Sequence, residues 1–542
     1  MRVTKYSFIS ISGLVACANA NIEVRDDLAG ILSDPAGACS QLGSSLSIDN
    51  VTVNFASYLP AGTNISLSQD FDLASCGFTS QVITADMCRL AMYVSTSNRS
   101  GITLEAWLPT NWTGRFLSTG NGGVSGCIQY ADLAYTAGLG FATVGANNGH
   151  NGTSGRAFGN NTDVVHDFAD RSLHTGVVVG KQITEKYYGT AHKKSYYLGC
   201  STGGRQGFKS VQTYPEDFDG VVAGAPALNF PNLNSWSASF FTYFGSPGNP
   251  AYVPRPLWTL IHQEILNQCD GIDGVVDGII EDAELCRFRP EALQCPSNAT
   301  VNSTTCLTSP QVDAVRKTFT DFYGVNGELI YPRMNPGSEV VASNVYYLNG
   351  AMPYPTDWFK YVVLNDSTWD PATFTIQDAE FSNNQNPFDI KTWHGDISAF
   401  QKAGGKLLHY HGQMDAIITS ENSPVYYNLV SRTMGLNSSE LDDFYRFFRV
   451  GGMGHCSGGD GAHMLGQRLG EITTLDPQNN ILMRMVDWVE KGNAPETITG
   501  TKYVNNTQAL GVDLVRNHCK YPKRNFCVDP ANYKKAEAWK CI

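Results

Sequence analysis

The stretch SYYLGCSTGGRQGFKSVQTY, residues 195–214, decides how the rest of the chain is interpreted. Its start, SYYLG, predicts a short buried strand, and RQGFKSVQTY (205–214) predicts a helix. Between them lies Gly199-Cys200-Ser201-Thr202-Gly203-Gly204, a G-x-S-x-G pattern on a strand-to-helix turn. Small neighbours let such a turn hold a serine in a strained conformation with its hydroxyl exposed. We therefore expect Ser201 to be a nucleophile and the backbone N–H of Thr202 to face a developing oxyanion.

Strand-like and helix-like segments alternate on both sides of this turn. Short apolar runs occur at 102–109, 115–120, 140–146, 220–227 and 406–412, and helical stretches at about 170–188 and 477–491. This alternation indicates an α/β fold with a mostly parallel sheet covered on both faces. The alternation of strand-like and helix-like segments stops after Pro226. The next roughly 170 residues are rich in aromatic residues, Asn and Cys. We expect an α/β catalytic domain made of residues 21–227 and 396–542, interrupted by a lid domain at 228–395.

A serine nucleophile needs a histidine base and an acid that orients it, in the chain order Ser, Asp or Glu, His for this kind of turn. His455 lies in the glycine-rich loop GGMGHCSGG (451–459), which can aim a side chain at a neighbour. Asp415 follows the predicted strand KLLHYHG (406–412), at a strand end where active-site groups collect. His409 and His411 alternate with apolar residues inside that strand, and we expect structural roles for them.

Two cysteines connect these candidates, because Cys200 precedes Ser201 and Cys456 follows His455. A bridge between them would hold the two backbones about 5.5 Å apart; the alternative is that both pair elsewhere. A second backbone N–H usually helps to bind the oxyanion in such sites. The glycine-rich run 120–123, which follows RFLST (115–119), makes the N–H of Gly122 or of Gly123 the candidate.

The first residues, 1–20, have the pattern of a secretory signal peptide, with a basic start, a short apolar core and Ala18-Asn19-Ala20 at its end. No other segment has about 18 uninterrupted apolar residues, so we expect an exported protein without a membrane span. Export favours disulfides, and the 13 cysteines beyond the signal suit six bridges and one odd thiol. N-glycosylation sequons begin at Asn50, Asn64, Asn98, Asn111, Asn151, Asn160, Asn298, Asn302, Asn365, Asn437 and Asn505.

The composition excludes two broad classes of protein. Of the 542 residues, 42% are hydrophobic and 11% aromatic, which is incompatible with a disordered chain. The formal charge is −12, and no run of Lys or Arg supplies the basic surface that nucleic acids require.

A candidate calcium loop lies in the expected lid, in the sequence CDGIDGVVDGIIEDAELC (269–286). Asp270, Asp273 and Asp277 are each followed by Gly, and recurring carboxylates on a bent loop suit a hard cation that takes six to eight oxygens. Backbone carbonyls of Val275 and Ile279 can complete the ligand set, while Cys269 and Cys286 clasp the loop. The alternative is an acidic turn that binds no metal.

With Gly-Cys-Ser-Thr-Gly-Gly, the Asp-Gly repeats, Asp415 and Gly-His-Cys in this order, the sequence resembles the tannase and feruloyl esterase family of secreted fungal serine esterases. The resemblance implies an α/β-hydrolase domain with a lid, a Ser201–His455–Asp415 triad and a structural Ca²⁺. The calcium ligands that it implies are Asp270, Asp273, Val275, Asp277 and Ile279. The implied disulfides are Cys200–Cys456, Cys39–Cys88, Cys76–Cys127, Cys295–Cys306 and Cys519–Cys541, beside the Cys269–Cys286 clasp, and Cys527 would be the odd thiol.

The resemblance also implies the reaction, which is hydrolysis of esters of aromatic acids on plant polysaccharides or tannins. We expect a hydroxycinnamate esterase, with a galloyl esterase (tannase) and a catalytically silent carbohydrate-binding protein as alternatives. Aromatic side chains of the expected lid are candidates for holding the phenolic ring. The aromatic residues that we expect to contact the phenolic ring are Phe230, Trp236, Tyr354 and Trp358.

Overall fold

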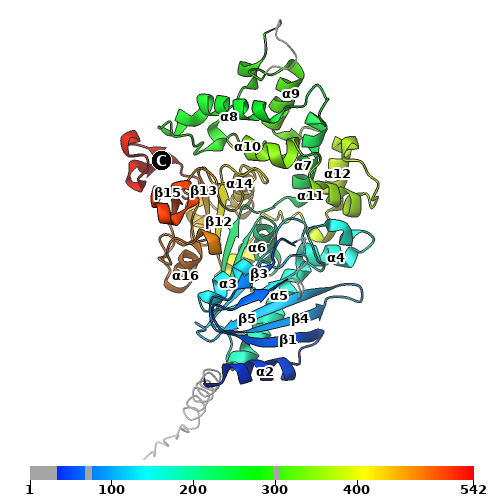
Figure 1. The fold of residues 1–542 in the computed structure, drawn as a ribbon, viewed down its shortest axis with the longest axis vertical. Coiled ribbons are helices and arrows are strands. Elements are labelled where there is room, and N and C mark those ends of the chain that lie inside the picture. The colour runs from blue at the N-terminus through cyan, green and yellow to red at the C-terminus, as the bar shows by residue number, and fades with distance from the viewer. Residues whose placement is uncertain (1–32, 68–75, 297–303) are drawn as a thin grey trace, which may run out of the picture.

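A computed structural model describes residues 33–67, 76–296 and 304–542, and the expected signal peptide lies outside these ranges. A nine-stranded sheet runs through the molecule in the order β1-β4-β5-β7-β6-β8-β9-β12-β13 (Figure 1). Its strands are β1 (Val51–Leu59), β4 (Met87–Ser95), β5 (Gly101–Pro109), β6 (Arg115–Thr119), β7 (Phe141–Ala146), β8 (Lys194–Cys200), β9 (Gly220–Gly224), β12 (Lys406–Gly412) and β13 (Tyr445–Val450). All neighbours from β7 to β13 pair in parallel, whereas β1, β4 and β5 pair antiparallel at one edge. The α/β class predicted from the sequence is confirmed.

Helices cover both faces of this sheet. Successive residues of a strand point to opposite faces, so each central strand contributes side chains to two separate cores. Tyr197 of β8 packs in one core with helices α2 (Pro35–Ser45), α5 (Ser172–Tyr188), α6 (Thr202–Thr213) and α14 (Asn422–Met434). Its neighbours Tyr196 and Leu198 pack in another core with α3 (Tyr130–Gly138) and α16 (Ile481–Lys491). The central strands are therefore buried on both sides, which explains the apolar runs within their sequences.

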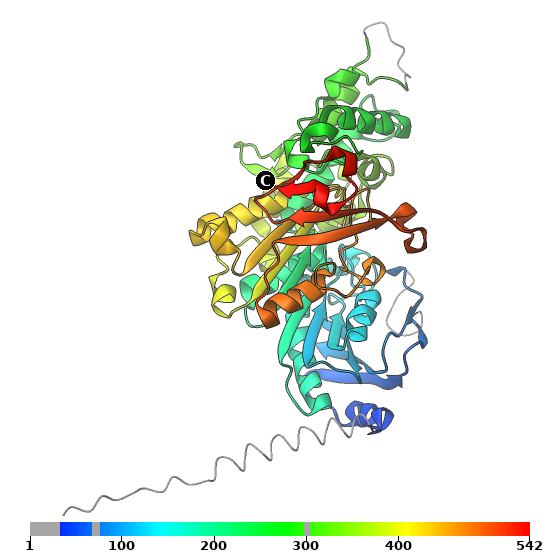
Figure 2. The ribbon, with the colours of Figure 1, turned by 90° about the vertical axis from the view of Figure 1, so that its left-hand side faces the viewer.

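The segment between β9 and β12 is mainly helical and lies beyond the carboxyl ends of the central strands (Figures 1 and 2). Its helices are α7 (Phe230–Phe244), α8 (Arg255–Cys269), α9 (Ser309–Thr318), α10 (Glu339–Ala342), α11 (Pro353–Trp358), α12 (Ile376–Gln385) and α13 (Ser398–Lys402), with a small hairpin of β10 (Phe322–Tyr323) and β11 (Leu329–Tyr331). Aromatic residues such as Trp236, Trp258 and Trp358 form its core. That core also includes Phe158 and Phe168, which precede β8, so the insert packs continuously against the first half of the chain.

Smaller elements complete the fold. They are the hairpins β2 (Asn64–Ser66) with β3 (Ser80–Val82), β14 (Thr497–Tyr503) with β15 (Val512–Cys519) and β16 (Asn525–Cys527) with β17 (Trp539–Cys541), and the short helices α4 (Thr162–His166) and α15 (Ser438–Leu441). In the parts of the chain that the structure describes, no helix is long and apolar enough to cross a membrane.

Six disulfides join the described cysteines. They are Cys39–Cys88, Cys76–Cys127, Cys200–Cys456, Cys269–Cys286, Cys295–Cys306 and Cys519–Cys541, which are the pairs that the sequence led us to expect. Cys527 is free and buried.

Candidate active site

Ser201 occupies the turn between β8 and α6 in a conformation that few residues adopt, with φ 65° and ψ −124°. Backbone hydrogen bonds fix this strained turn: Ser201 N–H donates to Gly224 O at 3.0 Å, and Ser201 O accepts from Ala227 N–H at 3.0 Å. A Cβ atom at Gly204 would lie 2.3 Å from Gly224 O, so the helix approaches β9 only because this position is glycine. The serine hydroxyl lines a cavity and has no hydrogen-bond partner among the described residues.

Asp415 and His455 come together from the ends of β12 and β13. His455 Nδ1 lies 2.7 Å from Asp415 Oδ2, and Asp415 is fully buried. Asp415 Oδ1 accepts backbone N–H groups of Ile417 at 2.8 Å and Ile418 at 2.9 Å. Burial acts to raise the pKa of Asp415, but the charge of His455 and hydrogen bonds from two histidines hold it well below its usual value. The carboxylate therefore stays ionised and fixes the His455 ring.

The Cys200–Cys456 bridge holds the backbone next to His455 close to the backbone next to Ser201. The Cα atoms of the two cysteines lie 6.0 Å apart. His455 Nε2 has no partner in the described ranges, and both His455 and Ser201 line the same cavity. The geometry thus gathers the three residues expected from the sequence into one site.

A buried hydrogen-bond chain behind Asp415 was not foreseen from the sequence. His411 Nε2 lies 3.2 Å from Asp415 Oδ2, and its Nδ1 lies 2.7 Å from Ser423 Oγ. Ser423 Oγ lies 2.9 Å from His409 Nε2, whose Nδ1 lies 3.1 Å from the Tyr445 hydroxyl. One donor direction satisfies every link with neutral histidines: Tyr445 donates to His409, His409 to Ser423, Ser423 to His411, and His411 to Asp415. Burial keeps the pKa of His409 well below its usual value, which agrees with this direction.

Backbone N–H groups of Thr202, Gly122 and Gly123 border the same cavity and have no partner within the described chain. Gln206 of α6 ties their loop to the serine turn. Its Oε1 accepts Asn121 N–H at 3.0 Å, and its Nε2 donates to Asn121 Oδ1 at 3.0 Å. Unpaired donors held by a buried amide network form the arrangement that stabilises an oxyanion.

The cavity has a volume of about 420 Å³, which suits a small aromatic ligand. Of the four lid aromatics proposed from the sequence, Phe230 and Tyr354 line it. Trp236 and Trp358 do not, which corrects the expectation for both: they are buried in the core of the insert. Trp358 instead supports Phe230 from behind, edge to face, at a ring distance of 5.1 Å. Sequence composition alone does not distinguish such a supporting aromatic residue from one that lines a cavity.

The acidic loop has an excess of buried negative charge. Asp273 Oδ2 and Asp277 Oδ2 are buried without a hydrogen bond, and Arg516 is the cation beside Asp277 and Glu281, at 3.5 Å from Asp277. Burial raises the pKa of Asp273 to about 8, with a further contribution from Glu281. No group of three or more His, Cys, Asp or Glu side chains in the described segments is arranged to hold a metal by itself. The orphaned carboxylate oxygens fit a hard cation that backbone carbonyls help to bind.

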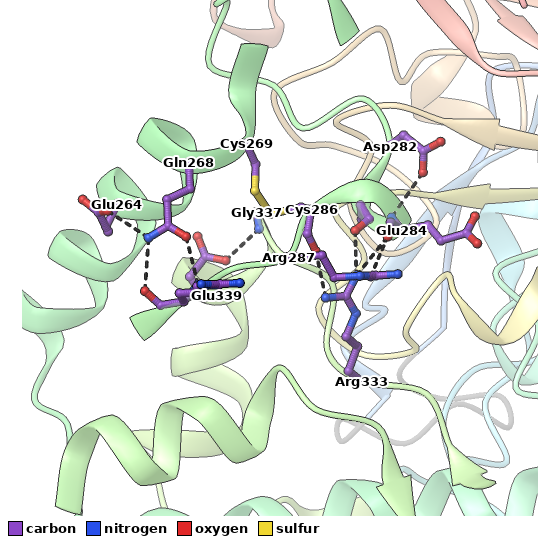
Figure 3. The surroundings of a disulfide bond; sticks show 12 residues. Glu264, Gln268, Cys269, Asp282, Glu284, Cys286, Arg287, Arg333, Gly337 and Glu339 are labelled. Carbon is purple, nitrogen blue, oxygen red and sulfur yellow. Dashed lines mark hydrogen bonds between the residues drawn. A yellow bond between two sulfur atoms is a disulfide. The ribbon is translucent and has the colours of Figure 1, made fainter. Parts of the chain in front are cut away.

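Arg333 and Asn335 link this loop to the segment of Asp415. Figure 3 shows Arg333 beside the turn that ends in the Cys269–Cys286 bridge, where it donates to Cys286 O at 2.8 Å. Arg333 also donates to Glu421 at 3.0 Å, and Asn335 Nδ2 donates to Asp415 O at 3.3 Å. The insert therefore contacts Asp415 directly.

The sheet, the serine turn and the order of the site residues define an α/β-hydrolase. The family model described as "Tannase and feruloyl esterase" matches residues 87–542, and the chain belongs to this family, whose members are carboxylic ester hydrolases. A probable feruloyl esterase B-2 of Aspergillus oryzae is 57% identical over 506 residues, which cover 93% of this chain and 95% of that protein. The crystal structure of feruloyl esterase B from Aspergillus oryzae is 52% identical with a TM-score of 0.91, covering 94% of this chain and 100% of that one. Tannin acyl hydrolase from Aspergillus niger shares the fold, with a TM-score of 0.73 at 20% identity, covering 93% and 95%. The family membership predicted from the motifs is confirmed.

Proposed function

We propose that the protein is a secreted serine carboxylesterase that hydrolyses esters of hydroxycinnamic acids, such as ferulate, caffeate and p-coumarate, with plant cell-wall polysaccharides. The observation that carries the proposal is the Asp415–His455 pair bridged to the Ser201 turn beside unpaired backbone donors. Support for the acyl group comes from relatives named as feruloyl esterases at 52–57% identity. The cavity volume and the rings of Phe230 and Tyr354 suit a phenolic acid.

The mechanism is acyl transfer through the serine. His455 takes the Ser201 proton as Oγ bonds to the ester carbonyl carbon, and the negative oxygen is held by N–H groups of Thr202 and of Gly122 or Gly123. The carbon–oxygen bond to the alcohol then breaks, and the proton on His455 passes to the departing alcohol oxygen. Water, deprotonated by His455, attacks the acyl-enzyme, releases the acid and restores Ser201. Asp415 stabilises the charged imidazole throughout.

We further propose a structural Ca²⁺ held by Asp270, Asp273, Val275, Asp277 and Ile279. The support is the pair of buried carboxylate oxygens on Asp273 and Asp277 that accept no hydrogen bond from the described residues, of which only the Asp277 oxygen has a cation, Arg516, nearby. The ion would neutralise the loop, and it would take no part in the chemistry because these residues do not line the cavity.

Secretion and N-glycosylation belong to the same proposal. The six disulfides suit an oxidising compartment. Nine sequon asparagines fall in described segments, and all nine are exposed; Asn298 and Asn302 lie outside the described residues.

The test compares hydrolysis of methyl ferulate, methyl caffeate, methyl p-coumarate and methyl gallate by the wild type and Ser201→Ala. We expect preference for the cinnamates and a loss of at least about 10³-fold in kcat for the folded variant. A preference for gallate would identify a tannase instead. Absence of turnover, together with failure of an organophosphonate to label Ser201, would favour a silent carbohydrate-binding protein.

A further inference from the structure

The cavity has two chemically different ends. Toward the insert it is lined mainly by apolar and aromatic groups, among them Phe230, Leu233 and Met352, with Asn234 and Ser237 as polar members. The other end belongs to α3 and to the segment that leads into the short helix η11 (Leu469–Glu471), two elements in contact with each other. Its lining side chains include Phe78, Gln129, Asp132, Gln467 and Arg468, which are mostly polar. In Figure 1, α6 lies between α3 on one side and α7 and α11 on the other.

The polar end is attached to the loop of the base. Gln467 Nε2 donates to Cys456 O at 3.2 Å, directly after His455, and to His463 O at 3.1 Å. His455 must deliver its proton to the departing alcohol oxygen, so the alcohol half of an ester has to lie beside this loop. The polar end is therefore the place for the alcohol, and the apolar end is left for the aromatic acid.

The charged groups at the polar end have no protein partners. Neither the Asp132 carboxylate nor the Arg468 guanidinium forms a hydrogen bond or an ion pair within the described residues, although both line one cavity. Burial raises the pKa of Asp132 to about 6, and the charge of Arg468 opposes this rise. A carboxylate that accepts and a guanidinium that donates together match a group with several adjacent hydroxyls.

One aromatic ring, Phe78, completes this wall. Phe78 packs edge-on against Tyr130 at a ring distance of 6.4 Å. The Cys76–Cys127 bridge joins its segment to the loop before α3, and Asn121 Nδ2 donates to Cys127 O at 3.0 Å. The ring offers an apolar face to the C–H groups of a bound molecule.

We propose that Asp132, Arg468, Gln129 and Phe78 form a subsite for a sugar on the alcohol side of the ester. Asp132 accepts and Arg468 donates hydrogen bonds to ring hydroxyls, while Phe78 packs against the sugar ring. The inference rests on the proposed esterase function and adds to it a determinant of alcohol specificity that is separate from the acyl pocket.

The first experiment compares kcat/KM for 5-O-feruloyl-L-arabinose with that for methyl ferulate. The ratio of the two values should fall about 10-fold or more in Asp132→Asn and in Arg468→Gln, because each loses a charge-assisted hydrogen bond to the sugar. Arg432→Gln, at an exposed arginine of α14, is the matched control and should keep the wild-type ratio. A ratio that stays at the wild-type value in both subsite variants, whether or not both substrates slow down together, overturns the proposal.

A binding experiment separates this proposal from the esterase function itself. Calorimetric titration of Ser201→Ala with an arabinoxylan oligosaccharide should give a Kd that rises about 10-fold when Asp132→Asn is added. This result would support the subsite even if the acyl preference proved to be for gallate. Equal Kd values in the two variants, or no binding to Ser201→Ala, would reject it.

Discussion

At the scale of single residues, Ser201 shows strain that is maintained by its surroundings. A non-glycine residue at φ 65° is costly, and the hydrogen bond to Gly224 and the close packing at Gly204 keep it there. The strained turn ends a strand and begins a helix, so the hydroxyl and the Thr202 N–H enter the same cavity. The turn was predictable because its glycines leave room for close approach: a Cβ at Gly199 would lie 2.6 Å from the Tyr197 hydroxyl, and one at Gly204 2.3 Å from Gly224 O.

His411 was expected to be structural, and its contact with Asp415 gives it a testable second role. His411→Gln should lower kcat/KM about 10-fold, because Asp415 loses a hydrogen bond to its charged form and holds His455 less firmly. The pKa of Asp415 should also rise toward its usual value, since the hydrogen bond from His411 is one of the contacts that lower it. The measurement is a pH–rate profile with thermal unfolding recorded on the same samples.

Ser423→Ala is the matched control for His411, because it breaks the chain one step further from Asp415. We expect a smaller effect on kcat/KM from this variant. If His411→Gln lowered only the melting temperature and left the profile of the folded enzyme unchanged, His411 would be no more than a core residue.

At the scale of elements, the central parallel strands and β5 were predictable, and the outer antiparallel strands β1 and β4 were not. Strands β6, β8, β9 and β12 contain recognisable apolar runs because both faces are covered. Strand β4 contains Arg89, which is buried and paired with Glu105 of β5 at 2.6 Å. A charged residue in the middle of a segment argues against a buried strand when the sequence is considered alone. The partner that neutralises Arg89 lies in another strand, so the segment's own sequence does not reveal it. The contact between His411 and Asp415 was equally hidden, because it depends on how the chain turns after β12.

The acidic loop between α8 and Cys286 should make stability depend on calcium. Removing Ca²⁺ with a chelator should lower Tm by several degrees, because a ligand that binds only the folded state stabilises it. Added Ca²⁺ should restore Tm, and Mg²⁺ should restore less of it because it demands a smaller, octahedral site. Differential scanning calorimetry checks this.

In Asp273→Asn, one proposed calcium ligand becomes neutral, so Tm should be lower and should no longer respond to the chelator. A wild-type Tm that is unaffected by chelator, with no calcium detected by elemental analysis, would contradict the proposal.

Strand β15 should contribute to the acid sensitivity of the fold through His518. Burial lowers the pKa of His518 to about 3, while its unfolded value is about 6.5. Between these values the unfolded state binds more protons, so the free energy of unfolding rises with pH. The contribution is fully present above about pH 6.5 and is lost as the pH falls toward 3.

His518→Gln should flatten this part of the stability curve, measured by denaturant unfolding from pH 4 to 7. The variant retains a side-chain donor for Ala462 O, which His518 Nε2 contacts at 2.9 Å. A wild-type slope in His518→Gln would show that other groups dominate acid unfolding.

At the scale of the whole molecule, the Cys200–Cys456 bridge connects residues 256 apart in sequence. In the chain-entropy model it stabilises the fold by about 5 kcal/mol, against about 3 kcal/mol for Cys519–Cys541, whose cysteines are only 22 apart. Cys200→Ser/Cys456→Ser should therefore lose more stability than Cys519→Ser/Cys541→Ser. It should also lose kcat, because the bridge holds the His455 loop against the serine turn.

Chemical unfolding and kcat at 25 °C, measured on both double variants, test this difference. Equal kcat values in the two would mean that the bridge stabilises the fold without positioning Ser201 and His455.

The same bridge determines whether the enzyme stays in one piece after a protease cuts the chain. The turn between β10 and β11, around residues 325–328, is exposed and lies inside the ring that the bridge closes. Of the six disulfides, Cys200–Cys456 alone would join the two fragments after a cut there. A nicked enzyme should therefore migrate as one species on a non-reducing gel, separate into two bands with reductant, and remain active until the reductant is added. Serine and histidine would stay paired in a chain that is no longer continuous.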